Sequence, residues 1–116
     1  MTLPLTTDTL RHCYEFLDST PPFNKWNLPD SPDVKFKVIR DPALRGWYRK
    51  ENGKHTIGVS SSCVGHTLSL MIVMAHEMIH VFEEHSNACG AGEHSAAFNR
   101  WAAQVCKFHG YDPKLF

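Results

Sequence analysis

Residues 67–85 of the 116-residue chain read TLSLMIVMAHEMIHVFEEH, and the helix that this stretch predicts is apolar on most of its sides. Its main polar interruptions, His76, Glu77 and His80, fall together in the second half of the stretch. Apolar side chains avoid water, so a helix of this composition is expected to be central. The remaining segments are therefore expected to pack around it.

The segments before this helix predict an α+β fold. Apolar residues at helical spacing predict an N-terminal helix over about residues 8–18, and alternation of apolar residues with lysines predicts a strand over 33–40. Strands over 46–50 and 54–60 form an antiparallel hairpin, because Asn52-Gly53 between them supplies the positive φ angles of a tight turn. We expect a small antiparallel sheet of about three strands.

A last helix is expected over about residues 93–108, after a chain reversal at 87–92 that contains two glycines. One face of this helix is predicted to carry His94, Phe98, Trp101, Val105 and Phe108. With a length typical of one domain and no linker or repeat, residues 1–116 are interpreted as a single domain.

The composition argues against several classes of protein. Twelve Lys and Arg residues balance twelve Asp and Glu residues, so the net charge does not support nucleic-acid binding, which would need a local basic patch. The longest apolar run, residues 70–75, is too short to span a membrane, and residues 1–5 lack the features of a signal peptide. We expect a cytoplasmic protein without a membrane partner, whereas the sequence leaves its oligomeric state open.

The four cysteines are widely spaced and form no C-x-x-C pair, which excludes a zinc ribbon and a thioredoxin-type motif. They are interpreted as free thiols. These cysteines are Cys13, Cys63, Cys89 and Cys106.

The polar residues of the central stretch form an H-E-x-x-H motif, residues 76–80. Residues four apart lie about 40° apart around a helix, so the imidazoles of His76 and His80 can reach one ion from one face. Neutral imidazole nitrogens are preferred ligands of Zn²⁺. Glu77 is then expected beside the metal as a general base, because its carboxylate can take a proton from a water that zinc activates.

The third metal ligand has several candidates, and helical geometry ranks them. His85 lies half a turn away from His76 on a continuous helix, and Glu83, one turn past His80, is better placed to support the metal ligands than to bind the ion itself. His94 follows the glycine-containing reversal and opens the last helix, so we favour it as the third ligand. The full set of candidates is Glu83, Glu84, His85, Glu93 and His94.

These motifs together resemble the SprT-like, or Spartan-type, zinc metalloprotease domain. The resemblance rests on Gly46-Trp47-Tyr48, the strand at 57–60, the H-E-x-x-H helix, and His94 followed by Phe98. It covers about residues 23–108. The chain departs from the family at Ser95-Ala96, where Gly-Pro is usual, and it has no cysteine pairs for the DNA-binding zinc ribbon of many members.

The resemblance implies a minimal, stand-alone, zincin-like endopeptidase domain whose zinc is held by His76, His80 and His94. A protein or peptide substrate is expected to pair with the strand from Thr56 to Ser60, taken as an edge strand. Two other functions are considered: a non-catalytic binding module stabilised by zinc, and a zinc-dependent endoribonuclease. No second donor to the oxyanion is identifiable, although Tyr48, His55, His66 and Arg100 are candidates.

Overall fold

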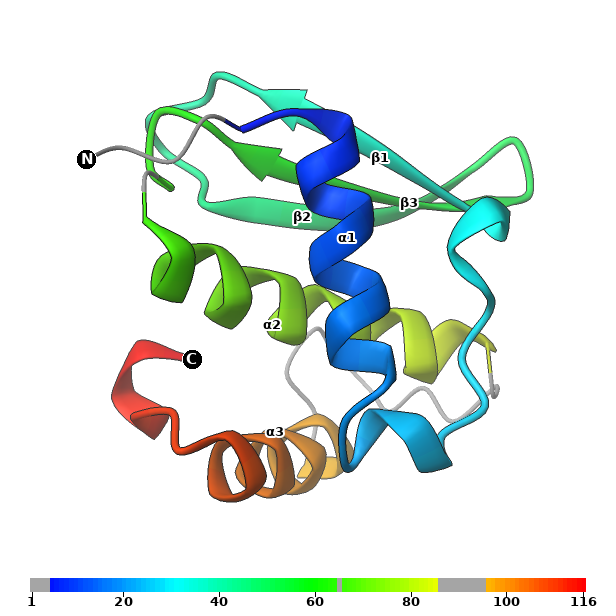
Figure 1. Ribbon diagram of the computed structural model, residues 1–116, viewed down its shortest axis with the longest axis vertical. Coiled ribbons are helices and arrows are strands. Elements are labelled where there is room, and N and C mark those ends of the chain that lie inside the picture. The colour runs from blue at the N-terminus through cyan, green and yellow to red at the C-terminus, as the bar shows by residue number, and fades with distance from the viewer. Residues whose placement is uncertain (1–4, 65, 86–95) are drawn as a thin grey trace.

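A computed structural model of the chain describes residues 5–64, 66–85 and 96–116. The fold is α+β, with an N-terminal helix, a three-stranded sheet and two further helices (Figure 1). Its helices and strands are α1 (Thr7–Asp18), β1 (Val34–Ile39), β2 (Gly46–Glu51), β3 (Lys54–Ser60), α2 (Thr67–His85) and α3 (Ala96–His109). Short 3₁₀ turns occur at Phe23–Lys25, Ser31–Asp33 and Pro113–Leu115.

The sheet is mixed, with strand order β1-β3-β2. The β2–β3 hairpin is antiparallel as predicted, and its turn residues Asn52 and Gly53 have φ angles of 51° and 77°. β1 pairs parallel to β3, with Phe36 opposite Ile57, so the expectation of an entirely antiparallel sheet is wrong. Alternating apolar residues predict that one face of β1 is buried, but they do not specify the direction of the neighbouring strand.

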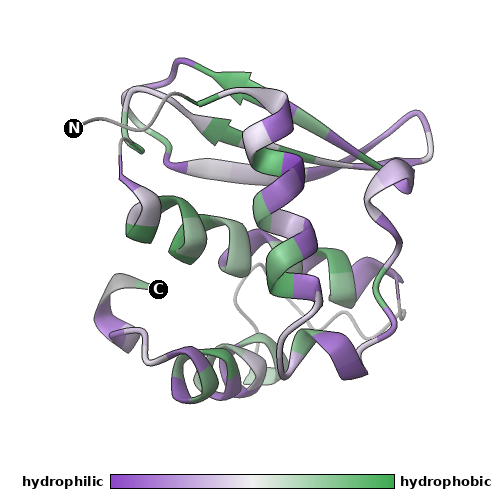
Figure 2. Ribbon diagram, in the orientation of Figure 1, coloured by the Kyte–Doolittle hydropathy of each residue, from purple (hydrophilic) through white to green (hydrophobic). Residues whose placement is uncertain are grey.

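α2 is the central element of the fold. It packs against β2 and β3 on one side and against α1 and α3 on others, which explains why apolar residues extend along its length (Figures 1 and 2). Its residues Met74, Met78, Ile79 and Val81 are fully buried. The predicted bounds of this helix, 67–85, are confirmed.

α1 covers the same face of the sheet as α2. The side chain of Thr6 caps the helix by accepting a hydrogen bond from the backbone N–H of Thr9, at 3.1 Å. Tyr14 is fully buried and packs edge to face on Phe36 of β1, with ring centroids 5.6 Å apart. The aromatic contact fixes α1 against the sheet.

α3 is confirmed as a helix, although its buried face differs from the prediction. Phe98 and Val105 are buried as expected, but Phe108 is 60% exposed and Cys106 is buried instead. On a helix Cys106 and Phe108 each lie about 80° from Phe98, but on opposite sides of it, and the side that carries Cys106 is the one that packs against the rest of the protein. The predicted start of the helix at 93, including His94, lies outside the described residues.

Two further expectations concern the cysteines and the membrane. Cys13, Cys63 and Cys106 are free thiols, as predicted, and Cys89 lies outside the described residues. Across residues 5–64, 66–85 and 96–116, no helix combines the length and hydropathy that crossing a bilayer requires.

Gly58 of β3 is required by the packing of Trp47, its cross-strand partner on β2. A Cβ atom on Gly58 would lie only 2.5 Å from Cε2 of the indole ring. We predict that Gly58→Ala lowers the free energy of unfolding by about 1–3 kcal/mol, because the methyl group and the ring overlap. Urea denaturation measures this loss. In a Trp47→Ala background the same substitution should cost much less, and an equal cost in both backgrounds would contradict the packing described.

Candidate metal centre

α2 brings His76, Glu77 and His80 into one group. Each residue contributes a possible ligand atom, and these atoms all lie within 4.8 Å of one another. The two imidazole rings have centroids 5.3 Å apart and are inclined by 67°. Two imidazoles and a carboxylate, held close together on a buried helix, form a candidate metal site.

Glu83 supports His80 from the next turn of α2. Nδ1 of His80 and Oε1 of Glu83 are 2.9 Å apart, and the two side chains are only 13% and 8% exposed. A carboxylate accepts hydrogen bonds, so Nδ1–H donates and the lone pair of Nε2 is left to bind a metal. Glu83, expected to lie close to the metal ligands, is thus found bonded to one of the two histidines.

Aromatic rings from the C-terminal half of the chain pack against both histidines. The ring of Phe98, in the first turn of α3, stacks on His80 with centroids 4.7 Å apart and lies 5.0 Å from the ring of His76. The ring of Phe116 lies 5.4 Å from that of His76. These contacts hold the imidazoles in an apolar setting and limit their rotation.

Two surface hollows open beside this group, and both are lined by Gly46, His76 and Glu77. One hollow, of about 210 Å³, also includes Arg45 and Phe116. The other, of about 310 Å³, extends over Leu44, Trp47, Tyr48 and His80. The beginning of β2 therefore runs along the open side of the candidate site.

Gly46 permits this close approach of β2 to α2. A Cβ atom at Gly46 would lie 2.8 Å from Cγ1 of Val73 and 3.5 Å from Oε2 of Glu77. Any side chain at this position would crowd the helix and the Glu77 carboxylate. Glycine thus keeps the carboxylate accessible from the hollows.

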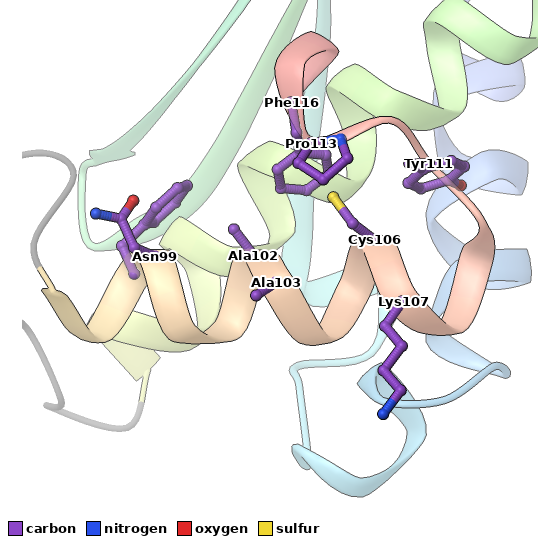
Figure 3. A pocket seen from close by; sticks show the side chains of 9 residues that line it. Asn99, Ala102, Ala103, Cys106, Lys107, Tyr111, Pro113 and Phe116 are labelled. Carbon is purple, nitrogen blue, oxygen red and sulfur yellow. The ribbon is translucent and has the colours of Figure 1, made fainter.

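A larger pocket of about 420 Å³ lies between α3 and the C-terminal turn (Figure 3). Phe98 and Phe116 line it and also contact His76, so the two rings stand between this pocket and the candidate site. Cys106 and Tyr111 form part of its buried lining. The pocket itself contains neither Glu77 nor a metal-site histidine.

Of the candidate donors to the oxyanion, Tyr48 borders the site, whereas His66 and Arg100 do not. Tyr48 lines a hollow, but its hydroxyl lies 2.6 Å from Nδ1 of His55 and is hydrogen-bonded there. Burial lowers the pKa of His55, and the charge of Lys50 lowers it further. His66 and Arg100 are exposed and line neither hollow.

Arg45 borders the candidate site, although it was not among the candidate donors that the sequence indicated. It lines the smaller hollow beside Glu77, and its backbone carbonyl accepts a hydrogen bond from the N–H of Ser60 at 2.8 Å. Its position directly before Gly46-Trp47-Tyr48 was the available signal. His94 and Glu93, two candidates for the third ligand, lie outside the described residues.

In comparisons with known proteins, no model of a protein family matches the chain and no curated protein matches it. The chemistry of the site must therefore be argued from its own residues.

The hydrogen bond between Glu83 and His80 predicts a role in metal affinity. We expect Glu83→Ala to weaken Zn²⁺ binding by about 10- to 100-fold, because His80 loses the partner that fixes its ring and tautomer. Competition with a chromophoric chelator measures this affinity without any need for activity. Glu84→Ala is the matched control, since this neighbour is 42% exposed and points toward Lys50. Equal losses in the two variants would contradict a specific role for Glu83.

Proposed function

We propose that this protein is a zinc-dependent endopeptidase of the SprT-like kind. His76, His80 and His94 hold the ion, and Glu77 is the general base. The observation that carries the proposal is the group formed by His76, Glu77 and His80. Their candidate ligand atoms lie within 4.8 Å of one another, and the group borders two open hollows. A metal site that only stabilises a fold is closed by its ligands, whereas these hollows leave room for a substrate.

The donor set fits zinc. Imidazole nitrogens suit this ion, and the bond from His80 to Glu83 is typical of a histidine that binds metal through its other nitrogen. When bound, zinc lowers the pKa of a water molecule and polarises the carbonyl group of the substrate.

Glu77 has the position that a general base needs. Its side chain is 6% exposed overall, yet it lines both hollows and faces the gap left by Gly46. The carboxylate takes up a proton from the attacking water and later transfers it to the nitrogen of the leaving amine. Burial protects this proton transfer from competing solvent.

The role of His94 is supported by the packing of α3. Phe98, four residues further along the chain, contacts both His76 and His80. Four residues of polypeptide span at most about 14 Å, a length that allows His94 to approach the same ion.

We propose that the substrate pairs with β2. The expectation that it pairs with the segment from Thr56 to Ser60 as an edge strand does not fit the sheet. That segment belongs to β3, which is paired on both sides, so its backbone groups are already used. In the part of the chain that the structure describes, β2 pairs with β3 alone. Its other edge begins at Gly46, next to Glu77, and can add an extended polypeptide by backbone hydrogen bonds.

Glu77→Gln tests the endopeptidase proposal. The wild-type protein loaded with one zinc ion should cleave an unfolded protein such as casein. The variant should retain its zinc and lose about 100- to 10,000-fold in kcat/KM, because the amide cannot accept the proton. Glu84→Gln, on the same helix but away from both hollows, should cleave like the wild type.

Two results would overturn this function. Cleavage of casein by Glu77→Gln at the wild-type rate would exclude Glu77 as the base. Absence of cleavage by wild-type protein that holds one zinc ion, together with a fall in thermal stability when the ion is removed, would identify a metal-stabilised binding module.

A further inference from the structure

The face of the sheet that points away from the helices is strongly basic. Ile57 and Val59 of β3 are buried in the core, so the residues that alternate with them point to the other side of the sheet. Cross-strand pairing extends this outer face to β1 and β2. The charged residues that the register assigns to it are Lys35, Lys37, Arg49, Glu51 and Lys54.

Four cations and one carboxylate make this face unlike the chain as a whole, in which basic and acidic residues are equal in number. Nζ of Lys37 lies 2.9 Å from Oε1 of Glu51. The hydrogen bond from Lys37 lowers the pKa of Glu51, and the charges of Arg49 and Lys35 add to the effect. One carboxylate is thus surrounded by cations, and the face retains an excess of positive charge.

The lysines border a defined hollow at the hairpin end of the sheet. Lys35, Lys37 and Lys54 line this hollow together with Glu51 and Asn52, and its volume is about 560 Å³. Anionic groups that enter it would be attracted by three ammonium groups from two strands. The hollow therefore fits an acidic ligand.

Trp47 argues against single-stranded nucleic acid as that ligand. One face of its indole ring lies on Gly58, and the guanidinium of Arg49 stacks over the ring at 4.2 Å from the centroid. Proteins that bind single strands offer open aromatic faces on which the bases stack. Trp47 is the aromatic residue that the register assigns to the outer face of the described strands, and its ring is already in contact with Gly58 and the Arg49 guanidinium.

β2 connects the basic face to the candidate metal centre. Its first residue, Gly46, lines both hollows beside Glu77, and its last residue, Glu51, lines the basic hollow. At about 3.3 Å per residue, the strand covers roughly 17 Å between these points. A polypeptide that follows the edge of β2 would reach the basic hollow after about five residues.

We propose that the basic outer face, residues Lys35, Lys37, Arg49 and Lys54, binds an acidic stretch of the polypeptide substrate. Antiparallel pairing is slightly more stable than parallel pairing, so the substrate runs against β2 and its acidic stretch precedes the scissile bond. The last residue of the acidic stretch lies about five residues before that bond, where the substrate passes the hairpin, and the rest of the stretch extends from there toward the N-terminus of the substrate, in the basic hollow. This inference rests on the proposed endopeptidase function and names its substrate class.

Binding is tested first, in protein that cannot cleave. Zinc-loaded Glu77→Gln protein is titrated into a fluorescein-labelled peptide with a block of aspartates, and anisotropy is followed. We expect Lys35→Glu with Lys54→Glu to weaken binding about 10-fold or more, and the pair Lys35→Arg with Lys54→Arg to bind normally. Lys25→Glu with Lys107→Glu is the matched control, because these exposed lysines lie on the helical side of the molecule. Thermal denaturation verifies that each variant is folded.

Cleavage then tests the position of the acidic stretch. In otherwise wild-type protein, Lys35→Glu with Lys54→Glu should lower kcat/KM about 10-fold for a peptide whose block of aspartates ends about five residues before the scissile bond. A peptide with serines in place of the aspartates should be cleaved equally by both proteins. Equal losses on both peptides, or the same effect when the aspartates follow the scissile bond, would overturn the proposal.

A competition experiment addresses the alternative ligand. An oligothymidine that displaces the acidic peptide and binds more tightly than the peptide would overturn the proposal in favour of nucleic acid. The binding test does not depend on activity. If no peptide is cleaved, yet the acidic peptide binds in a manner that requires Lys35 and Lys54, the endopeptidase function fails while the acidic-ligand surface stands.

Discussion

The withdrawal of His76, Glu77 and His80 from most solvent, on a largely apolar helix, is the constraint on which the candidate site depends. α2 lies between the sheet and α3, and this packing removes His76, Glu77 and His80 from most solvent. Buried polar groups are costly without partners. The Glu83 carboxylate is hydrogen-bonded to His80, and the group borders two hollows beside β2. A metal bound by His76 and His80 would couple the stability of the domain to the chemistry of the site.

Two glycines of the sheet permit close packing, one beside the candidate site and one on the outer face of the sheet. Gly46 lets β2 pass next to Val73 and Glu77, and Gly58 lets the Trp47 ring lie flat on the sheet. Both positions reflect close approach between elements and not a need for unusual backbone angles. Gly46 leaves room for an extended chain beside Glu77, whereas Gly58 leaves room for the Trp47 ring on the outer face of the sheet.

Charge is distributed unevenly although the net charge is zero. The outer face of the sheet concentrates Lys35, Lys37, Arg49 and Lys54 around a single acid, Glu51. Because interactions between exposed charges decay over about a Debye length, a local excess of this kind acts on ligands even when the whole chain is neutral. Net charge alone gives no indication of such a surface, and in this protein it argued against nucleic-acid binding without a local basic patch.

Much of the fold could be predicted from short-range patterns. The bounds of α2, the Asn52-Gly53 hairpin turn and the group of His76, Glu77 and His80 all follow from residues at most four apart, whose geometry is set by the helix or the turn itself. The support of His80 by Glu83 is of the same kind, since three residues separate them on one helix.

Long-range features were decided by the tertiary structure. β3 pairs with both β1 and β2 and is therefore the central strand. The edge of the sheet next to Glu77 consequently belongs to β2. Cys106 replaces Phe108 on the buried face of α3, because the position of the neighbouring helix selects the stripe that is covered. The sequence by itself determined the α+β class, the central helix and the candidate metal ligands on it. The order of the strands, the open edge and the basic face depend on contacts between distant segments, which local periodicity does not encode.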